Sequence, residues 1–343
     1  MKSRGGKGQE HEMKDSVLNL GRRFVASIMK GIEEIPKSDG MLLMRGVTNL
    51  QTGTVVDSIV IRGVERLFWE ECLKQVMTPD IRCRVCAVGT PGTGKTTSTL
   101  FLIRTLFENK HTVVYRFPGA SYFYVFKWRP YTGYDVNVYT QEHSLWDVES
   151  LSDPSTFYIV DPGNSGKNCL PHTSFAARTI IVSTCEVSDY WGGSELTKQR
   201  GNVTGMFRIF PMWDLEELLV ARPYLQETVL TDEDVEARFR QVGGLPRYVF
   251  SRKRYLLSTL QNQKYAIASL TAKEAELIVN GDMDAVGSFV DGRCKSEIIG
   301  YAKTYKDGEI TFETRNVEFI SQFVAAKVVE ELIPDLRSHA PGR

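Results

Sequence analysis

RVCAVGTPGTGKTTSTLFLIRTLF, residues 84–107, is the most informative stretch of this 343-residue chain. A short apolar run at 84–88 leads into a glycine-rich loop, and helical spacing continues from Lys95 to about residue 108. The loop from Gly89 to Thr96 matches the pattern GxxxxGK[ST] in full, between an expected strand and an expected helix, which is the context the pattern requires. This stretch therefore predicts the phosphate-binding loop (P-loop) of a nucleotide-binding protein.

Each residue type in the loop has a chemical role. Glycines let backbone amides approach phosphate oxygens and form an anion-binding nest, and the start of the helix adds partial positive charge. We expect Lys95 to reach the β- and γ-phosphates and Thr96 to ligate Mg²⁺ through its hydroxyl. The predicted nucleotide-binding positions are Gly89, Thr90, Pro91, Gly92, Thr93, Gly94, Lys95, Thr96 and Thr97.

A P-loop needs a second Mg²⁺ anchor at the end of a neighbouring strand. The run FYIVD, residues 157–161, supplies Asp161 after four apolar residues, so Thr96 and Asp161 are the predicted metal ligands. The alternative is an ordinary strand-ending aspartate, because Pro162-Gly163 follows it. Many ATPases of this class have a catalytic glutamate directly after that aspartate, so Pro162 leaves the source of a base open, with Glu186 as one candidate.

Four residues are the predicted catalytic set. Ser183 ends the strand TIIVS, where a hydroxyl can sense a γ-phosphate or simply cap the strand, and Arg247 follows the helix break GGLP, where it can contact phosphates or lie on the surface. Arg200 precedes the last expected strand, the usual place of an arginine finger, but a solvated arginine is favoured there. The set is therefore Lys95, Asp161, Ser183 and Arg247.

The order of apolar segments predicts the fold class. Short, nearly continuous apolar strands separated by crossovers favour an α/β P-loop NTPase fold with a mostly parallel central sheet covered on both faces. The strands are expected at 54–61, 84–88, 111–117, 157–161, 179–183 and 206–210, with a hairpin at 122–139. A mainly helical lid and C-terminal region should follow, with helices at 214–225, 231–244 and 317–332 and a hairpin at 300–314 turning at Asp307-Gly308.

The same patterns predict three segments. Residues 1–54 should hold a flexible tail to residue 16 and a helix at 17–36, and residues 55–212 the nucleotide-binding domain, with a helix at 63–76. Residues 213–343 should form the lid and C-terminal region.

Bulk composition narrows the class of protein. Lysine plus arginine and aspartate plus glutamate both number 42, so a strongly basic nucleic-acid protein is not indicated, although a local basic patch remains open. The six dispersed cysteines favour reduced thiols inside the cell, and the Cys83-Cys86 pair lacks the further ligands of a zinc site. No apolar run approaches a membrane span, and no secretory signal is visible, so we expect no membrane partner and a nuclear or cytoplasmic protein.

Two further segments carry alternatives. Residues 121–134 interleave aromatic side chains with Lys127 and Arg129; packing of a hairpin is favoured over stacking on nucleic-acid bases. The cluster Arg252-Lys253-Arg254 fits a solvated helix face better than a nuclear-localisation signal.

Five blocks together are more specific than the P-loop alone. In order they are GTPGTGKTTSTLFLIRTLF, FYIVDPG, TIIVSTCEVSDYWGGSE, PMWDLEELLVARP and RFRQVGGLPRYVF. This series resembles the trypanosome retrotransposon hot spot protein family over about residues 40–335. Crinkler-type host-directed proteins carry a similar P-loop unit and are the near alternative.

The resemblance implies a multicopy family of nuclear and cytoplasmic P-loop proteins linked to chromatin, transcription and RNA handling. The family's motif residues fall on Gly89, Gly92, Gly94, Lys95 and Thr96, with Asp161 as the Mg²⁺ partner. Members are often longer at the N-terminus, so we expect a short copy. The resemblance also favours ATP over GTP as the nucleotide. A similarity to ATPases that have an additional strand in the sheet implies that the strand at 179–183 lies between the strand before the P-loop and the strand that ends at Asp161.

Two functions follow as expectations. The first is an ATPase or nucleotide-dependent regulator that uses ATP and Mg²⁺ in nuclear chromatin, transcription or RNA processes. Its expected partners are nuclear protein complexes, RNA or further copies of the same chain. The second is a non-hydrolysing, nucleotide-gated scaffold for protein or RNA partners, for which Pro162-Gly163 is the motive.

Overall fold

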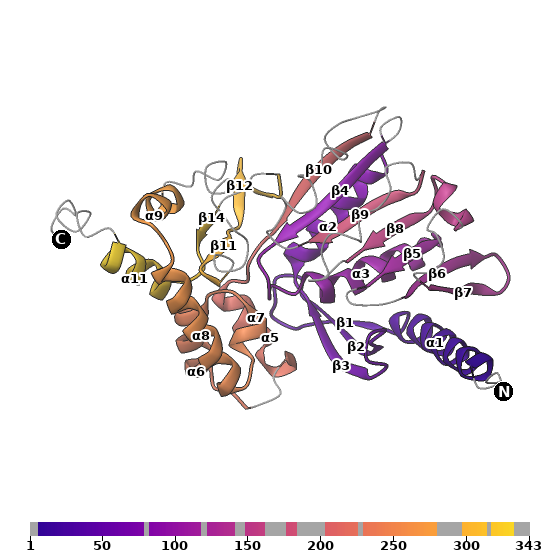
Figure 1. The fold of residues 1–343 in the computed structure, drawn as a ribbon, viewed down its shortest axis with the longest axis horizontal. Coiled ribbons are helices and arrows are strands. Elements are labelled where there is room, and N and C mark those ends of the chain that lie inside the picture. The colour runs from indigo at the N-terminus through magenta and orange to yellow at the C-terminus, as the bar shows by residue number, and fades with distance from the viewer. Residues whose placement is uncertain are drawn as a thin grey trace. The chain divides into compact units, whose positions relative to one another are not determined.

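The computed structural model forms two compact units. Unit 1 takes its residues from Met1–Cys86, Thr96–Ser183 and Asp189–Met206, and unit 2 from Ala87–Lys95 and Phe207–Arg343. The structure describes residues 6–78, 82–117, 122–140, 148–161, 176–183, 203–225, 229–279, 297–313 and 317–332 (Figure 1). The domain boundaries expected from the sequence stay predictions.

The largest sheet formed by the described residues has seven strands in the order β10-β4-β9-β8-β5-β6-β7. Their bounds are β4 Arg82–Gly89, β5 Val113–Arg116, β6 Tyr122–Arg129, β7 Gly133–Thr140, β8 Phe157–Val160, β9 Arg178–Ser183 and β10 Val203–Phe210. β5, β8 and β9 run parallel, whereas β5, β6 and β7 form an antiparallel meander. The mixed α/β class and the mostly parallel central sheet are confirmed, and β9 lies between β4 and β8 as expected.

The inner strands are apolar along their whole length because both faces are covered. All four residues of β8 and five of the six residues of β9 are buried. Such strands read as continuous hydrophobic runs without alternation, which is why the sequence located them well.

Two helices of unit 1 are joined by a buried polar contact. At the start of α2, Gly63–Val76, the Arg62 backbone N–H donates to the Glu65 carboxylate at 3.4 Å, and the Arg62 guanidinium pairs with the same carboxylate at 2.8 Å. α2 buries Trp69, and its indole N–H donates to the hydroxyl of Ser98 on α3, Lys95–Glu108. This hydrogen bond fixes α2 against α3.

The N-terminal region differs from its prediction. Helix α1 spans Gly6–Ile28, so the expected flexible tail to residue 16 is wrong from Gly6 onward, and the helix expected to continue to residue 36 ends at Ile28. A three-stranded sheet follows, comprising β1 Ile32–Glu34, β2 Leu42–Thr48 and β3 Val55–Ile61. β2 was not predicted, because its apolar run is interrupted by Arg45 and by Gly46 at φ +63°.

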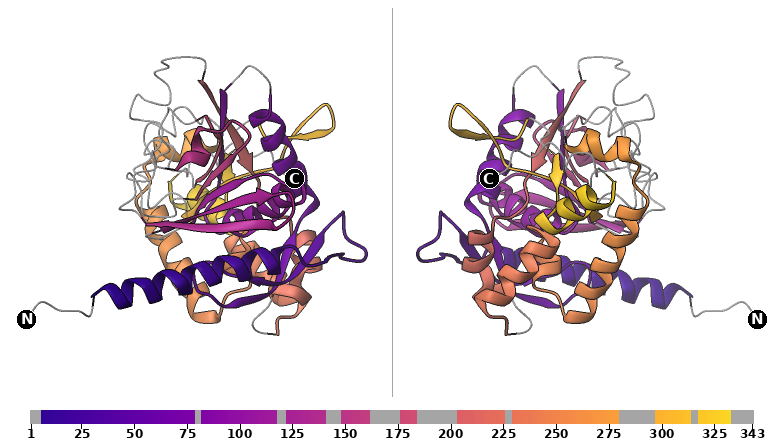
Figure 2. Two further views of the ribbon diagram at one scale, coloured as in Figure 1. Left: turned by 90° about the vertical axis from the view of Figure 1, so that its right-hand side faces the viewer. Right: turned by 90° about the vertical axis from the view of Figure 1, so that its left-hand side faces the viewer.

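The C-terminal half of α1 (indigo in Figure 2) lies against the β6–β7 hairpin. The Tyr124 hydroxyl donates to the Val17 carbonyl at 2.9 Å, and the Phe24 and Phe126 ring centroids are 5.6 Å apart. Most aromatic side chains of the hairpin are therefore packed inside unit 1, as favoured from the sequence. The exposed exception is Tyr131 at the turn.

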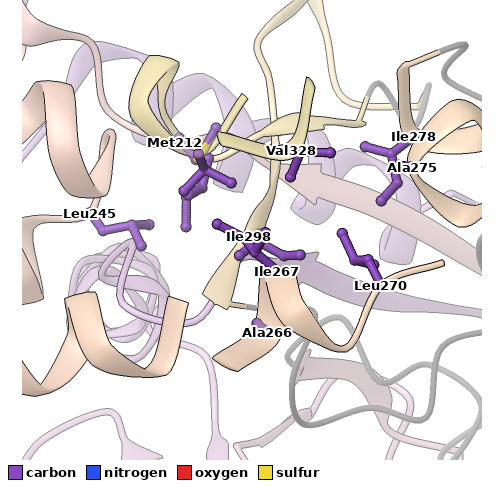
Figure 3. Packing of buried hydrophobic residues seen from close by; sticks show 11 residues of the cluster. Met212, Leu245, Ala266, Ile267, Leu270, Ala275, Ile278, Ile298 and Val328 are labelled. Carbon is purple, nitrogen blue, oxygen red and sulfur yellow. The ribbon is translucent and has the colours of Figure 1, made fainter. Parts of the chain in front are cut away.

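Unit 2 is mainly helical. Its helices are α5 Leu215–Leu225, α6 Asp232–Val242, α7 Pro246–Val249, α8 Lys253–Ala268, α9 Ala272–Val279 and α11 Gln322–Leu332. Helices α8, α9 and α11 share one apolar cluster with neighbouring loop residues, shown in Figure 3, of Met212, Leu245, Ala266, Ile267, Leu270, Ala275, Ile278, Ile298, Ile320, Val324 and Val328. α6 starts at the predicted cap, where the Asp234 N–H donates to the Thr231 hydroxyl at 3.2 Å.

Short strands complete unit 2. β11 Ile299–Tyr301 pairs with β14 Val317–Phe319, and β12 Thr304–Lys306 pairs with β13 Glu309–Thr311. The hairpin turn at Asp307-Gly308 is confirmed; both residues have positive φ, 55° and 85°. The helix expected from residue 317 is wrong in its first turn, because Val317–Phe319 pairs with β11 and the helix starts only after Ser321, whose hydroxyl accepts from the Val324 N–H.

Within the described ranges, no helix is both long enough and apolar enough to cross a membrane.

The packing of α1 yields a stability prediction. A Cβ added at Gly21 would lie 2.6 Å from a ring carbon of buried Tyr124 and 2.6 Å from a methyl of Val136. We expect Gly21→Ala to lower the free energy of unfolding by about 1–2 kcal/mol, because overpacking costs about 1–3 kcal/mol and the helical preference of alanine offsets about 1 kcal/mol. Denaturant unfolding measures the change. Gly31→Ala is the control, since its Cβ would meet open space; equal stability of the two variants would contradict the packing.

Candidate functional site

The predicted phosphate loop joins β4 to α3 and has the backbone that its glycines allow. Gly92 and Gly94 have φ of +93° and +97°, in the left-handed region that favours glycine. Thr93 closes the turn between them: its hydroxyl donates to the Thr90 carbonyl at 2.9 Å, and both threonines are fully buried. The glycines of the motif are thus required by the chain path itself.

Lys95 turns back onto its own loop. Its ammonium donates to the carbonyls of Gly89 at 2.6 Å and Thr90 at 3.0 Å, and the residue is only 7 % exposed. A Cβ at Gly89 would lie 2.8 Å from the Phe210 carbonyl and 3.2 Å from Cδ of Lys95, so only glycine fits this approach. A buried cation is therefore held within a loop of backbone dipoles, where its charge acts more strongly than in water.

Two residues far along the chain in unit 2 hold the loop from outside. The Trp213 indole N–H donates to the Thr93 carbonyl at 2.9 Å, and the Tyr301 backbone N–H donates to the Thr90 hydroxyl at 3.0 Å. Sequence reasoning missed both. The signal for Trp213 was a tryptophan three positions after β10, which ends at Phe210. Tyr301 acts through its backbone N–H, so its residue type gives no signal.

Arg247, a predicted catalytic residue, is placed beside the loop. Its backbone N–H donates to the Gly92 carbonyl at 3.4 Å, and its Cβ lies 3.4 Å from where a Cβ of Gly92 would be. The Arg247 side chain hydrogen-bonds with Tyr248. Burial raises the pKa of the Glu297 carboxyl and the nearby Arg247 guanidinium lowers it in part, so this arginine also has an acidic neighbour that the sequence did not indicate.

The two predicted metal ligands meet in unit 1. The Thr96 hydroxyl donates to Oδ2 of Asp161 at 2.6 Å, and Asp161 is 4 % exposed at the end of β8, where its N–H donates to the Arg116 carbonyl. Burial first, and then the charge of Asp161, raise the pKa of the Tyr115 hydroxyl well above its usual value. Tyr115 therefore stays neutral beside this carboxylate.

Ser183 is the last residue of β9 and is 4 % exposed. Its hydroxyl finds no hydrogen-bond partner in the part of the chain that the structure describes. Leaving a buried hydroxyl unpaired costs about 1–3 kcal/mol, so such a group stands out as a ligand-binding candidate.

The remaining predicted positions divide into two groups. Thr97 is exposed in the first turn of α3, and Pro91 is partly exposed in the loop. Pro162, Gly163, Glu186 and Arg200 lie outside the described residues. Cys72 and Cys86 are buried thiols outside any disulfide, and no cluster of three or more His, Cys, Asp or Glu side chains is formed by the described residues.

In comparisons with known proteins, no family model and no curated protein sequence matches this chain.

The loop contact of Trp213 can be tested by itself. We expect Trp213→Phe to lower the free energy of unfolding by about 1–3 kcal/mol and to speed amide exchange in the loop, because the smaller phenyl ring keeps only part of the packing while the Thr93 carbonyl loses its buried donor. Denaturant unfolding and hydrogen exchange measure the two effects. Trp128→Phe is the matched control on the partly exposed β6 ring; if it changes loop exchange equally, the indole hydrogen bond is not what holds the loop.

Proposed function

We propose that this chain binds ATP with Mg²⁺ through its P-loop and acts as an ATPase or nucleotide-dependent regulator. The observation that carries the proposal is the GxxxxGKT loop, in which Gly92 and Gly94 have left-handed backbone and Lys95 is buried against the loop carbonyls. A chance glycine-rich turn would not need a buried lysine at the first position of the following helix.

The phosphate part of the proposal rests on donors of the chain. Backbone N–H groups of the loop and the start of α3 supply fixed positive dipoles, and Lys95 supplies a mobile charge that can exchange the Gly89 and Thr90 carbonyls for phosphate oxygens. That exchange is favourable because a charge-assisted hydrogen bond to a phosphate is stronger than one to a neutral carbonyl.

The metal part rests on Thr96 and Asp161. Mg²⁺ usually keeps several waters and takes one or two protein oxygen ligands together with substrate phosphates. The hydroxyl and the carboxylate already lie 2.6 Å apart, which is a donor set of the right chemistry and number. When bound, Mg²⁺ would neutralise phosphate charge, while Thr96 and Asp161 would hold and orient it.

Two further groups support roles near the transferred phosphate. Ser183 offers a buried hydroxyl whose hydrogen-bonding capacity is unused among the described residues. Arg247 is fixed beside Gly92 by its backbone, and its guanidinium, which hydrogen-bonds with Tyr248 and has Glu297 nearby, is a cation of unit 2 that can turn to phosphate charge. We assign Ser183 to sensing and Arg247 to charge stabilisation.

The proposal extends to the cellular role only through the resemblance to retrotransposon hot spot proteins. On that basis the chain acts in the nucleus, the cytoplasm or both, in chromatin, transcription or RNA processes, with nuclear protein complexes, RNA or further copies of itself as partners.

A second candidate is a nucleotide-gated scaffold that does not hydrolyse ATP. The specific observation is that Pro162-Gly163 follows Asp161 in the sequence, where many ATPases have the glutamate that polarises the attacking water. Such a site would hold ATP and Mg²⁺ and change partner affinity without turnover.

The first test removes the loop lysine. We expect Lys95→Ala to weaken Mg²⁺-dependent ATP binding by roughly 10- to 100-fold, because a hydrogen bond to a charged group contributes about 1.5–3 kcal/mol. Isothermal titration of the purified chain measures the affinity. Lys74→Ala, an exposed lysine of α2, is the control; equal ATP affinity of wild type and Lys95→Ala would overturn the proposal.

Single-turnover hydrolysis separates the two candidates. Turnover in wild type that Lys95→Ala lacks supports the ATPase, and tight binding without turnover supports the scaffold.

The second test concerns the metal. We expect Asp161→Asn to lose most of the gain in ATP affinity that Mg²⁺ gives wild type, at least roughly tenfold, since even outer-shell partners of metal ligands contribute about 10–100-fold. Binding in EDTA should change little, because the phosphates are still held by the loop. The affinity is measured by titration with ATP at fixed Mg²⁺ and again in EDTA. The control is Asp57→Asn, which changes an exposed aspartate of β3. An unchanged Mg²⁺ response would remove Asp161 from the metal site.

A further inference from the structure

Residues 237–273 contain eight lysines and arginines and no aspartate or glutamate. The rest of the chain contains 42 aspartates and glutamates and 34 lysines and arginines (42 less the 8 of this segment). The zero net charge of the whole protein therefore conceals one strongly basic segment, which runs from the middle of α6 through α8 to the start of α9.

Several of these cations have structural work within unit 2. Arg238 donates to the carbonyls of Val249 and Ser251 at 2.8 and 2.7 Å, which fixes the turn before α8. Arg240 pairs with Glu236 at 3.1 Å, and Arg247 lies beside the P-loop. The internal contacts of Arg238 and Arg240 explain the presence of these two arginines, and Arg247 belongs to the nucleotide site proposed above.

Three cations on α8 differ. Lys253, Arg254 and Lys264 are all exposed, and among the described residues none of them forms an ion pair. Arg254 stacks on the neighbouring Tyr255: its guanidinium carbon lies 4.7 Å from the ring centroid, and it donates to the hydroxyl at 3.1 Å. Positive charge is therefore presented to solvent without an acidic partner.

The helical repeat gathers this charge with polar and aromatic groups. Arg254, Gln261 and Tyr265 are spaced by seven and four residues, which places them on one face of α8, and Lys264 flanks them. The opposite face, including Leu256 and Ile267, is buried in unit 2. We call the exposed residues Lys253, Arg254, Tyr255, Gln261, Lys264 and Tyr265 the α8 face.

Two tyrosines give the α8 face flat aromatic surfaces. Tyr255 is 54 % exposed and Tyr265 is 65 % exposed. Large exposed aromatic side chains between unpaired cations are the combination that tracks a phosphate backbone and stacks its bases.

We propose that the α8 face binds single-stranded nucleic acid, separately from the nucleotide site proposed above. The cations match the phosphate backbone, and the tyrosines need unpaired bases, which a duplex does not offer. A membrane surface fits less well, because the apolar side of α8 is buried in unit 2 and Leu257 is the one large aliphatic side chain exposed on this helix.

The experiment measures binding of the full chain, without nucleotide, to fluorescein-labelled 20-mers of U and of dT and to a 20-base-pair duplex, by anisotropy at several salt concentrations. Contacts to three phosphates should give a salt slope of about −2 for single strands. We expect the triple variant Lys253→Gln, Arg254→Gln, Lys264→Gln to remove most of that slope and to weaken binding roughly 20-fold. Tyr265→Ala should weaken it roughly fivefold or more with the slope unchanged.

The matched control variant replaces three exposed cations outside α8, Lys74→Gln, Arg240→Gln and Lys306→Gln. Its affinity and its salt slope should stay near those of wild type. Circular dichroism establishes that each variant is folded. Equal binding by the α8 variant and the control overturns the proposal, and so does binding only to phosphatidylserine vesicles or equal affinity for the duplex. A preference between the U and dT strands identifies the source as RNA or DNA and supports the shared chemistry.

Discussion

The polar backbone of residues 90–94, between strand β4 and helix α3, must be satisfied although it belongs to neither element, and Trp213 and Tyr301 of unit 2 help to meet that constraint. Gly92 and Gly94 adopt backbone that other residues resist, which turns the loop tightly. The carbonyls that this turn leaves inside are then taken up by Lys95 and by the Trp213 indole. A loop held in this way keeps one conformation before any ligand arrives, which reduces the ordering that ligand binding would require.

Sequence reasoning worked where one physical rule determined the structure. Continuous apolar runs marked β8 and β9 because both faces of these strands are covered, and the cap at Thr231 marked α6 because its hydroxyl accepts a backbone N–H. Asp161 was found because it directly follows a continuous apolar strand, and residues at the ends of parallel strands meet at one edge of the sheet. In the structure its carboxylate accepts a hydrogen bond from the Thr96 hydroxyl.

Sequence reasoning failed where distant partners determined the outcome. The sequence of Val317–Phe319 continues without a break into the helical pattern of the residues that follow. In the structure these three residues form a strand because they pair with β11, which lies earlier in the chain. The first turns of α1 are polar and looked like a tail. Tyr301 supports the loop between β4 and α3 through its backbone N–H, and Glu297 is close enough to feel the charge of Arg247, so no local pattern could have pointed to either residue.

The chain presents positive charge in two physically different ways. Lys95 is buried among carbonyls, where a single charge and fixed dipoles select a compact anion with little screening by salt. The cations of the α8 face are exposed, so their attraction is screened within about 8–10 Å and becomes strong only when several act on a polyanion together. The proposed nucleotide site therefore suits a small phosphate compound, and the proposed nucleic-acid site on the α8 face suits a long one. Because the two sites draw on different residues and respond differently to salt, each can be removed by substitution while the other is kept.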